Sequence, residues 1–142
     1  MPQALAHVTL LVRDYEEALA FFTESLGFRV VENSPLSASH RRILVAPPGS
    51  QGANIVLARA ATPEQLEQVG NQAAGHVFLF LYTDDFWRDY RLMLAANVQF
   101  FEPPRQESYG TVAVFEDLYG NKWDLLQPAD HSIARPRPKE CP

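Results

Sequence analysis

The chain has 142 residues and a formal net charge of −5, and an acidic chain of this kind argues against nucleic acid and anionic membranes as partners. Hydrophobic residues make up 46% of the sequence and charged residues 20%, a balance that supports a folded core and argues against disorder. No apolar run is long enough to span a bilayer, no signal-peptide pattern is visible, and the single cysteine, Cys141, has no partner for an internal disulfide, all of which favours a cytoplasmic protein.

The first half of the chain predicts one strand, one helix and three further strands. Residues 7–13 are rich in β-branched and apolar side chains that alternate between two faces, as a strand requires. Asp14 follows as the expected N-cap of a helix with an apolar face at helical spacing, and Gly27 ends that helix. The remaining strands are expected at 28–32, 41–46 and 54–60.

The second half predicts the same series after a linker at 61–75. Thr62 is the expected N-cap of a short linker helix that stops at Gly70. A strand is then expected at 76–83 and a helix at 85–96. Further strands are expected at 98–102, 109–115 and 122–126, and residues 128–142 are expected to form a polar, Pro-rich tail.

The two halves align as an internal repeat. Residues 14–32 match residues 84–102 at a constant offset of 70, and His7 and His76, which open the two halves, differ by 69. We interpret the chain as one domain, 1–127, built from two βαβββ modules at 5–60 and 76–127.

The order of elements, the histidine that opens each half and the closing segment "FEDLYGNKWDLLQP" resemble the vicinal oxygen chelate superfamily. This superfamily contains glyoxalases, bleomycin-resistance proteins and extradiol dioxygenases. The resemblance covers about residues 5–127, with Leu118 and Asp124 standing where the family motif has proline and glutamate. It implies an α+β, glyoxalase-like fold, in which two βαβββ modules form a cup-shaped mixed sheet around a small-molecule ligand, and it also implies a homodimer.

The same resemblance implies a metal site at His7, His76 and Asp124. Such a set of two histidines and one carboxylate suits a divalent Fe, Mn, Ni or Zn ion. Val56 stands where type I glyoxalases have a further ligand, so a standard glyoxalase site is not expected. Each histidine taken alone is better explained as a strand-edge residue bonded to a backbone carbonyl, but the repeat puts both histidines at equivalent strand positions, which favours the metal site. The alternative for Asp124 is a solvated edge carboxylate.

Two classes of function therefore remain open. The first is a metal-dependent enzyme, a lyase or a dioxygenase-like protein, whose substrate and catalytic residues the sequence does not name. The second is a metal-free protein that sequesters a small hydrophobic or aromatic compound, as the bleomycin-resistance branch does. In both cases we expect Phe78, Phe80 and Tyr109 to contact the ligand, the first two as wall residues and Tyr109 beside the mouth of the site.

Overall fold

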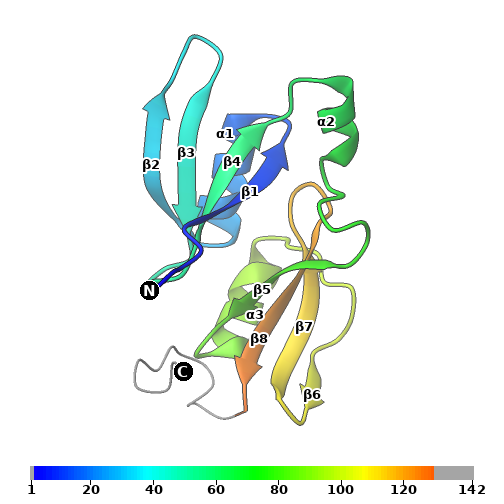
Figure 1. Cartoon of the computed structure of the whole chain (residues 1–142). Coiled ribbons are helices and arrows are strands. Elements are labelled where there is room, and N and C mark those ends of the chain that lie inside the picture. The colour runs from blue at the N-terminus through cyan, green and yellow to red at the C-terminus, as the bar shows by residue number, and fades with distance from the viewer. Residues whose placement is uncertain (1, 130–142) are drawn as a thin grey trace. The chain divides into compact units, whose positions relative to one another are not determined.

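The computed structural model describes residues 2–129, which form two compact units that divide between Gln72 and Ala73 (Figure 1). Each unit contains one four-stranded sheet. Residues 130–142, which make up nearly all of the expected Pro-rich tail, lie outside the described residues. None of the helices in the described range is long and apolar enough to cross a membrane.

Unit 1 has its strands in the order β1-β4-β3-β2, with β1 parallel to β4 and the other neighbours antiparallel. Asp14 is the N-cap of the first helix, as the sequence predicts, because its carboxylate accepts a hydrogen bond from the amide of Glu17 at 2.9 Å. The elements are β1 (His7–Val12), α1 (Tyr15–Ala20), η1 (Phe21–Ser25), β2 (Arg29–Pro35), β3 (Arg41–Ala46), β4 (Asn54–Arg59) and α2 (Pro63–Gln68).

The predicted first helix changes its winding at its C-terminal end. From Phe21 onward it continues as the single π-helical turn η1. The hydroxyl of Thr23 donates to the carbonyl of Leu19 at 2.7 Å, an acceptor that a regular α-helix offers to the amide of residue 23. The wider turn still buries Phe22 completely, so the apolar face predicted from the sequence is kept.

Unit 2 repeats the topology of unit 1. Its strands follow the order β5-β8-β7-β6, with β5 parallel to β8 and the other neighbours antiparallel. Its elements are β5 (Val77–Tyr82), α3 (Phe86–Ala95), β6 (Arg105–Glu107), β7 (Gly110–Glu116) and β8 (Lys122–Pro128). Two mixed sheets with one strand–helix–three-strand series each confirm the α+β class and the βαβββ repeat.

The strand predicted at 98–102 is the one element that the structure places elsewhere. Residues 99–101 do hydrogen-bond to β7, from Phe101 N to the carbonyl of Val114 at 2.9 Å and from Glu116 N to the carbonyl of Gln99 at 3.0 Å. Pro103 and Pro104 then follow, and neither has an amide hydrogen to donate to the ladder. Regular pairing resumes only after them, as β6.

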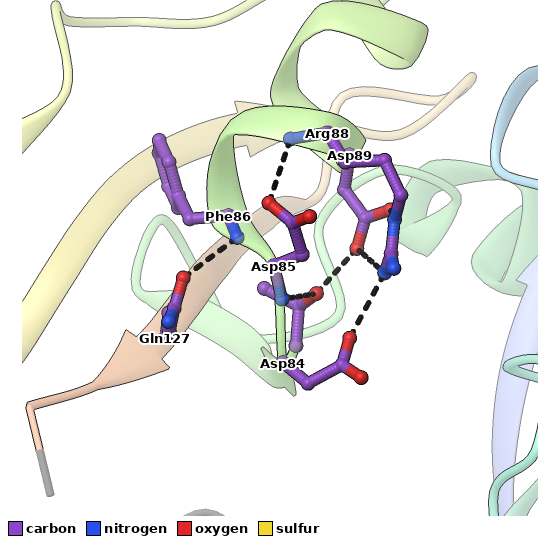
Figure 2. A network of polar contacts seen from close by, with 7 residues as sticks. Asp84, Asp85, Phe86, Arg88, Asp89 and Gln127 are labelled. Carbon is purple, nitrogen blue, oxygen red and sulfur yellow. Dashed lines mark hydrogen bonds and ion pairs between the residues drawn. The ribbon is translucent and has the colours of Figure 1, made fainter. Parts of the chain in front are cut away.

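Polar contacts fix the start of α3 against the ends of β5 and β8 (Figure 2). Asp85 caps the helix by accepting from the amide of Arg88 at 3.2 Å, and Gln127 of β8 accepts from the amide of Phe86 at 2.8 Å. Asp84 forms an ion pair with Arg88 at 3.0 Å, which also contacts Asp89. The two aspartates that follow the apolar run of β5 are therefore accounted for by capping and an ion pair.

The sheet of unit 2 has two different faces. The face toward α3 is packed by a series of touching rings that leads from Tyr90 through Phe100 and Phe115 to Trp123. Because side chains alternate along β8, Asp124 points to the opposite face. We call this opposite face of the second sheet the far face.

Candidate functional site

The far face brings an acidic side chain next to exposed aromatic ones. Phe80 of β5 and Val114 of β7 are the strand neighbours of Asp124, and Tyr82 is the strand neighbour of Leu126. Phe80 is 64% exposed and Tyr82 is 51% exposed, although both lie within a strand. The predicted contact residue Phe80 and the predicted ligand Asp124 are thus brought together by the strand register.

Asp124 has an acceptor atom without a partner. Its Oδ1 atom is buried and has no hydrogen-bond partner among the described residues. Burial raises the pKa of the Asp124 carboxyl, because the charged form loses hydration; Arg105 partly offsets this effect and Glu102 adds to it. A buried carboxylate oxygen left without a donor is costly, and such atoms in native proteins call for a specific explanation.

An arginine held by two glutamates lies beside Asp124. Arg105 of β6 pairs with Glu102 at 2.6 Å and also with Glu107. Hydrogen bonds to Glu102, Glu107 and Tyr109 raise the pKa of the guanidinium, so Arg105 stays charged. Sequence reasoning missed this group because it placed the strand at 98–102 and left residues 103–108 without an assigned element; the alternating charges at 102, 105 and 107 were the available signal.

The other two predicted contact residues lie at the edges of this surface. Phe78 is half-buried in β5, and Tyr109 is 51% exposed in the turn between β6 and β7. Tyr109 is tied to the site through Arg105, and its carbonyl accepts from the amide of Ala129 at 2.9 Å.

His7 lies in unit 1, as the first residue of β1, and is exposed. It pairs with Asn54 of β4, and Thr9 pairs with Val56, two residues further along both strands. Leu10 and Val12 are fully buried, so His7, Thr9 and Val56 share the opposite face of their sheet, as alternation predicts.

His76 lies in unit 2, immediately before β5, and is exposed. In β8, Lys122 lies two positions before Asp124. Its partner in β5 is Val77, because the register shifts between Val77 and Leu79. By strand register, Val77 of unit 2 therefore corresponds to His7 of unit 1. One extra residue in β5 breaks the alternation between His76 and Phe80, so strand geometry does not place these two side chains on one face.

Within either unit, the side chains of residues 2–129 form no group of three or more His, Cys, Asp and Glu residues placed to hold a metal ion. The predicted set combines His7 of unit 1 with His76 and Asp124 of unit 2 and stays a prediction.

A hollow of about 560 Å³ lies on unit 2 where α3 ends. It shares Glu102 with the arginine cluster, and the rest of its lining is apolar or amide in character apart from the phenol of Tyr90. It offers one carboxylate and no cationic side chain, so its chemistry is less specific than that of the far face. Its lining consists of Tyr90, Leu94, Asn97, Val98, Gln99, Phe100, Phe101, Glu102 and Pro103.

Asp117, the first acidic residue of the closing motif, has a structural role. It is only 3% exposed, and its carboxylate accepts four hydrogen bonds from the turn that follows it. The donors are the amides of Tyr119 and Asn121, the side-chain amide of Asn121 and the indole of Trp123, at 3.0–3.1 Å. The motif thus fixes the β7–β8 turn and, through it, the position of Asp124.

Asp124→Asn should raise the free energy of unfolding at pH 7 by about 1 kcal/mol, because the buried charge no longer has to be desolvated. The folded-state pKa of Asp124 is raised above the ordinary value of 3.8, so the wild-type carboxyl favours folding below that value and loses this contribution as pH rises through the folded pKa. The gain of the variant should therefore shrink as pH falls toward 3.8. Urea denaturation across this pH range measures it, with Glu116→Gln on the same face as the control; a gain independent of pH would contradict the assignment.

Comparisons with known proteins agree with this architecture. The family model described as Glyoxalase/Bleomycin resistance protein/Dioxygenase superfamily matches residues 4–125. A protein of Shewanella frigidimarina, described as uncharacterized, is 52% identical over 131 residues, which cover 92% of this chain and 97% of the relative. YurT of Bacillus subtilis, also described as uncharacterized, is 28% identical over 84% of this chain and 94% of its own.

Solved structures show the same fold. UcmS2 has a TM-score of 0.76 at 29% identity and matches 89% of this chain and 98% of its own. TnmS3, described as an antibiotic binding protein from Streptomyces sp. CB03234, has a TM-score of 0.74 at 27% identity and matches 90% of this chain and 98% of its own. With the family model spanning both βαβββ units, the chain belongs to the glyoxalase/bleomycin resistance protein/dioxygenase superfamily.

Proposed function

We propose that this protein binds a small aromatic molecule on the far face of the second sheet and does so without a metal ion. The observation that carries the proposal is the pairing of Phe80, 64% exposed, with Asp124, whose Oδ1 atom lacks a partner among the described residues. Phe80 and Tyr82 lie two residues apart on one face, and both rings are exposed there. Covering such a surface with a ligand recovers about 25 cal/mol for each Å² of apolar area removed from water.

One solved structure supports small-molecule binding as the function. TnmS3 is described as an antibiotic binding protein, and it is 27% identical to this chain over almost the whole length of both. Val56 adds only apolar surface at the position in unit 1 that corresponds to Asp124, since each is the third residue of its last strand. A binding protein needs apolar area and one or two oriented polar groups, and the far face provides both.

Phe80→Ala should weaken binding of the neutral probe naphthalen-2-ylmethanol by about tenfold, because the variant loses one ring from the binding surface. Isothermal titration calorimetry measures the dissociation constant. The matched control is Leu92→Ala, which removes a side chain of α3 that is 63% exposed and lies away from the far face. If the wild type and Phe80→Ala bind naphthalen-2-ylmethanol with equal affinity, the proposal is wrong.

The second candidate function is a divalent-metal-dependent enzyme, and it is favoured by the Asp124 oxygen that has no partner in the part of the chain that the structure describes. A carboxylate oxygen is a suitable ligand for Fe, Mn, Ni or Zn, and His7 and His76 would complete the set. A bound ion would supply Lewis-acid chemistry to a chelating ligand.

Elemental analysis of protein purified without chelator or metal-affinity tag separates the two candidates. The enzyme candidate predicts close to one metal ion per chain and its loss in His76→Ala. The binding-protein proposal predicts wild-type protein free of stoichiometric metal that still binds the aromatic probe. Stoichiometric metal that His76→Ala abolishes would replace our proposal by the enzyme candidate.

A further inference from the structure

We infer that the far face selects an aromatic molecule that carries a protonated amine, with the ammonium donating to Asp124 and the ring lying on Phe80. This inference rests on the proposed function and names its ligand class. It is drawn from the unsatisfied carboxylate oxygen of Asp124, the charges that surround it, and the distance between β5 and β8.

The carboxylate of Asp124 lacks a donor where a ligand would supply one. Its Oδ1 atom is buried and unpartnered within the described part of the chain. An ammonium that donates to this oxygen forms a charge-assisted hydrogen bond, which is roughly twice as strong as a neutral one. An apolar ligand placed there would leave the oxygen unsatisfied, and a second anion would be repelled.

The charges around Asp124 favour a cation. Arg105 is the cation whose charge lowers the pKa of Asp124. Its guanidinium forms two ion pairs, with Glu102 and Glu107. Lys122, two residues before Asp124 on the same face, holds its ammonium 5.3 Å from the ring centroid of Phe101. Asp124, Glu102 and Glu107 outnumber Arg105, and Glu116 and Lys122 on the same face offset each other in charge, so a ligand of charge +1 reduces the negative excess.

The aromatic part of the ligand follows from the strand register. Phe80 and Asp124 are directly paired across β5 and β8, and paired strands lie about 4.8 Å apart. A ring resting on Phe80 therefore reaches Asp124 with an amine attached through one carbon. The exposed ring of Tyr82, two residues along, adds a second π-face for the cation.

The test compares two probes that differ only in the donor group. Naphthalen-2-ylmethylamine carries an ammonium at pH 7, and naphthalen-2-ylmethanol is its neutral counterpart of the same shape. We expect the wild type to bind the ammonium about tenfold more tightly than the alcohol, as a hydrogen bond to a charged group implies. Isothermal titration calorimetry at pH 7 gives both dissociation constants.

Two variants locate the preference. Asp124→Asn keeps the shape of the side chain and should bring the ratio of the two affinities close to one, while circular dichroism checks that the variant is folded. Glu116→Gln removes one negative charge from the same face, where Glu116 pairs with Lys122, and should keep the wild-type ratio.

The outcomes separate this inference from the proposed function. Equal binding of both probes by the wild type would overturn the ammonium preference and leave aromatic binding in place. A wild type that binds neither probe would overturn both. A preference that survives in Asp124→Asn would show that another group recognises the amine and would also overturn the inference. The wild-type ratio decides the question even if the variant does not fold.

Discussion

Asp117→Ala should lower the free energy of unfolding by about 3–5 kcal/mol, because it leaves several buried donors without an acceptor. The carboxylate of Asp117 accepts from two backbone amides, one side-chain amide and the indole of Trp123. Asp117, Asn121 and Trp123 are all at most 3% exposed, so water does not readily replace the lost acceptor. Urea denaturation measures the change.

The matched control for this prediction is Asp84→Ala. Asp84 is also an aspartate at the end of a strand of unit 2, but its side chain is 79% exposed and its ion pair with Arg88 lies in solvent. Exposed pairs contribute little, so the control should change stability by less than about 1 kcal/mol. A loss of similar size in both variants would refute the assignment of Asp117 as the residue that fixes the β7–β8 turn.

Gly110→Ala should destabilise the protein by several kcal/mol, on the order of the largest effects known for single substitutions. A Cβ atom at this position would lie 2.2 Å from the carbonyl oxygen of Gln127 and 2.9 Å from the Cα atom of Pro128, both on the backbone of β8. Backbone atoms of a paired strand cannot move aside as a flexible side chain does. The φ angle of 150° adds strain for any residue with a Cβ atom.

Two other glycines separate the clash from the strain. Gly120 has a φ angle of 98° and nothing within 4 Å of a Cβ atom, so Gly120→Ala should cost only the strain of its backbone, about 1–2 kcal/mol. Gly52 has only the Ser50 hydroxyl oxygen nearby, at 3.7 Å, so Gly52→Ala should be close to neutral. The denaturation midpoint should be highest for Gly52→Ala, lower for Gly120→Ala and lowest for Gly110→Ala. If Gly110→Ala destabilises the protein no more than Gly120→Ala does, β7 and β8 can separate locally.

The repeat and most of its elements could be predicted from the sequence, because they depend on local chemistry. The short apolar segment before Pro47 predicted β3 at Arg41–Ala46, and the caps Asp14 and Thr62 lie where the sequence predicts them. Capping and periodicity involve residues close together in the chain, so all the interacting groups are visible in a short stretch of sequence. The closing motif likewise predicted the family that the family model supports.

The folded structure was needed to show which polar groups gather on the far face and which of them lack partners among residues 2–129. Arg105 pairs with Glu102 and Glu107 because β6 begins only after Pro103 and Pro104, whereas the strand predicted from the sequence ended at Glu102. Because of the extra residue in β5, Val77 and not His76 corresponds in register to His7. A shift of one residue reverses the face of every side chain before it. That the Oδ1 atom of Asp124 has no partner among residues 2–129 depends on all of its surroundings, because its burial and hydrogen bonding involve residues far apart in the chain.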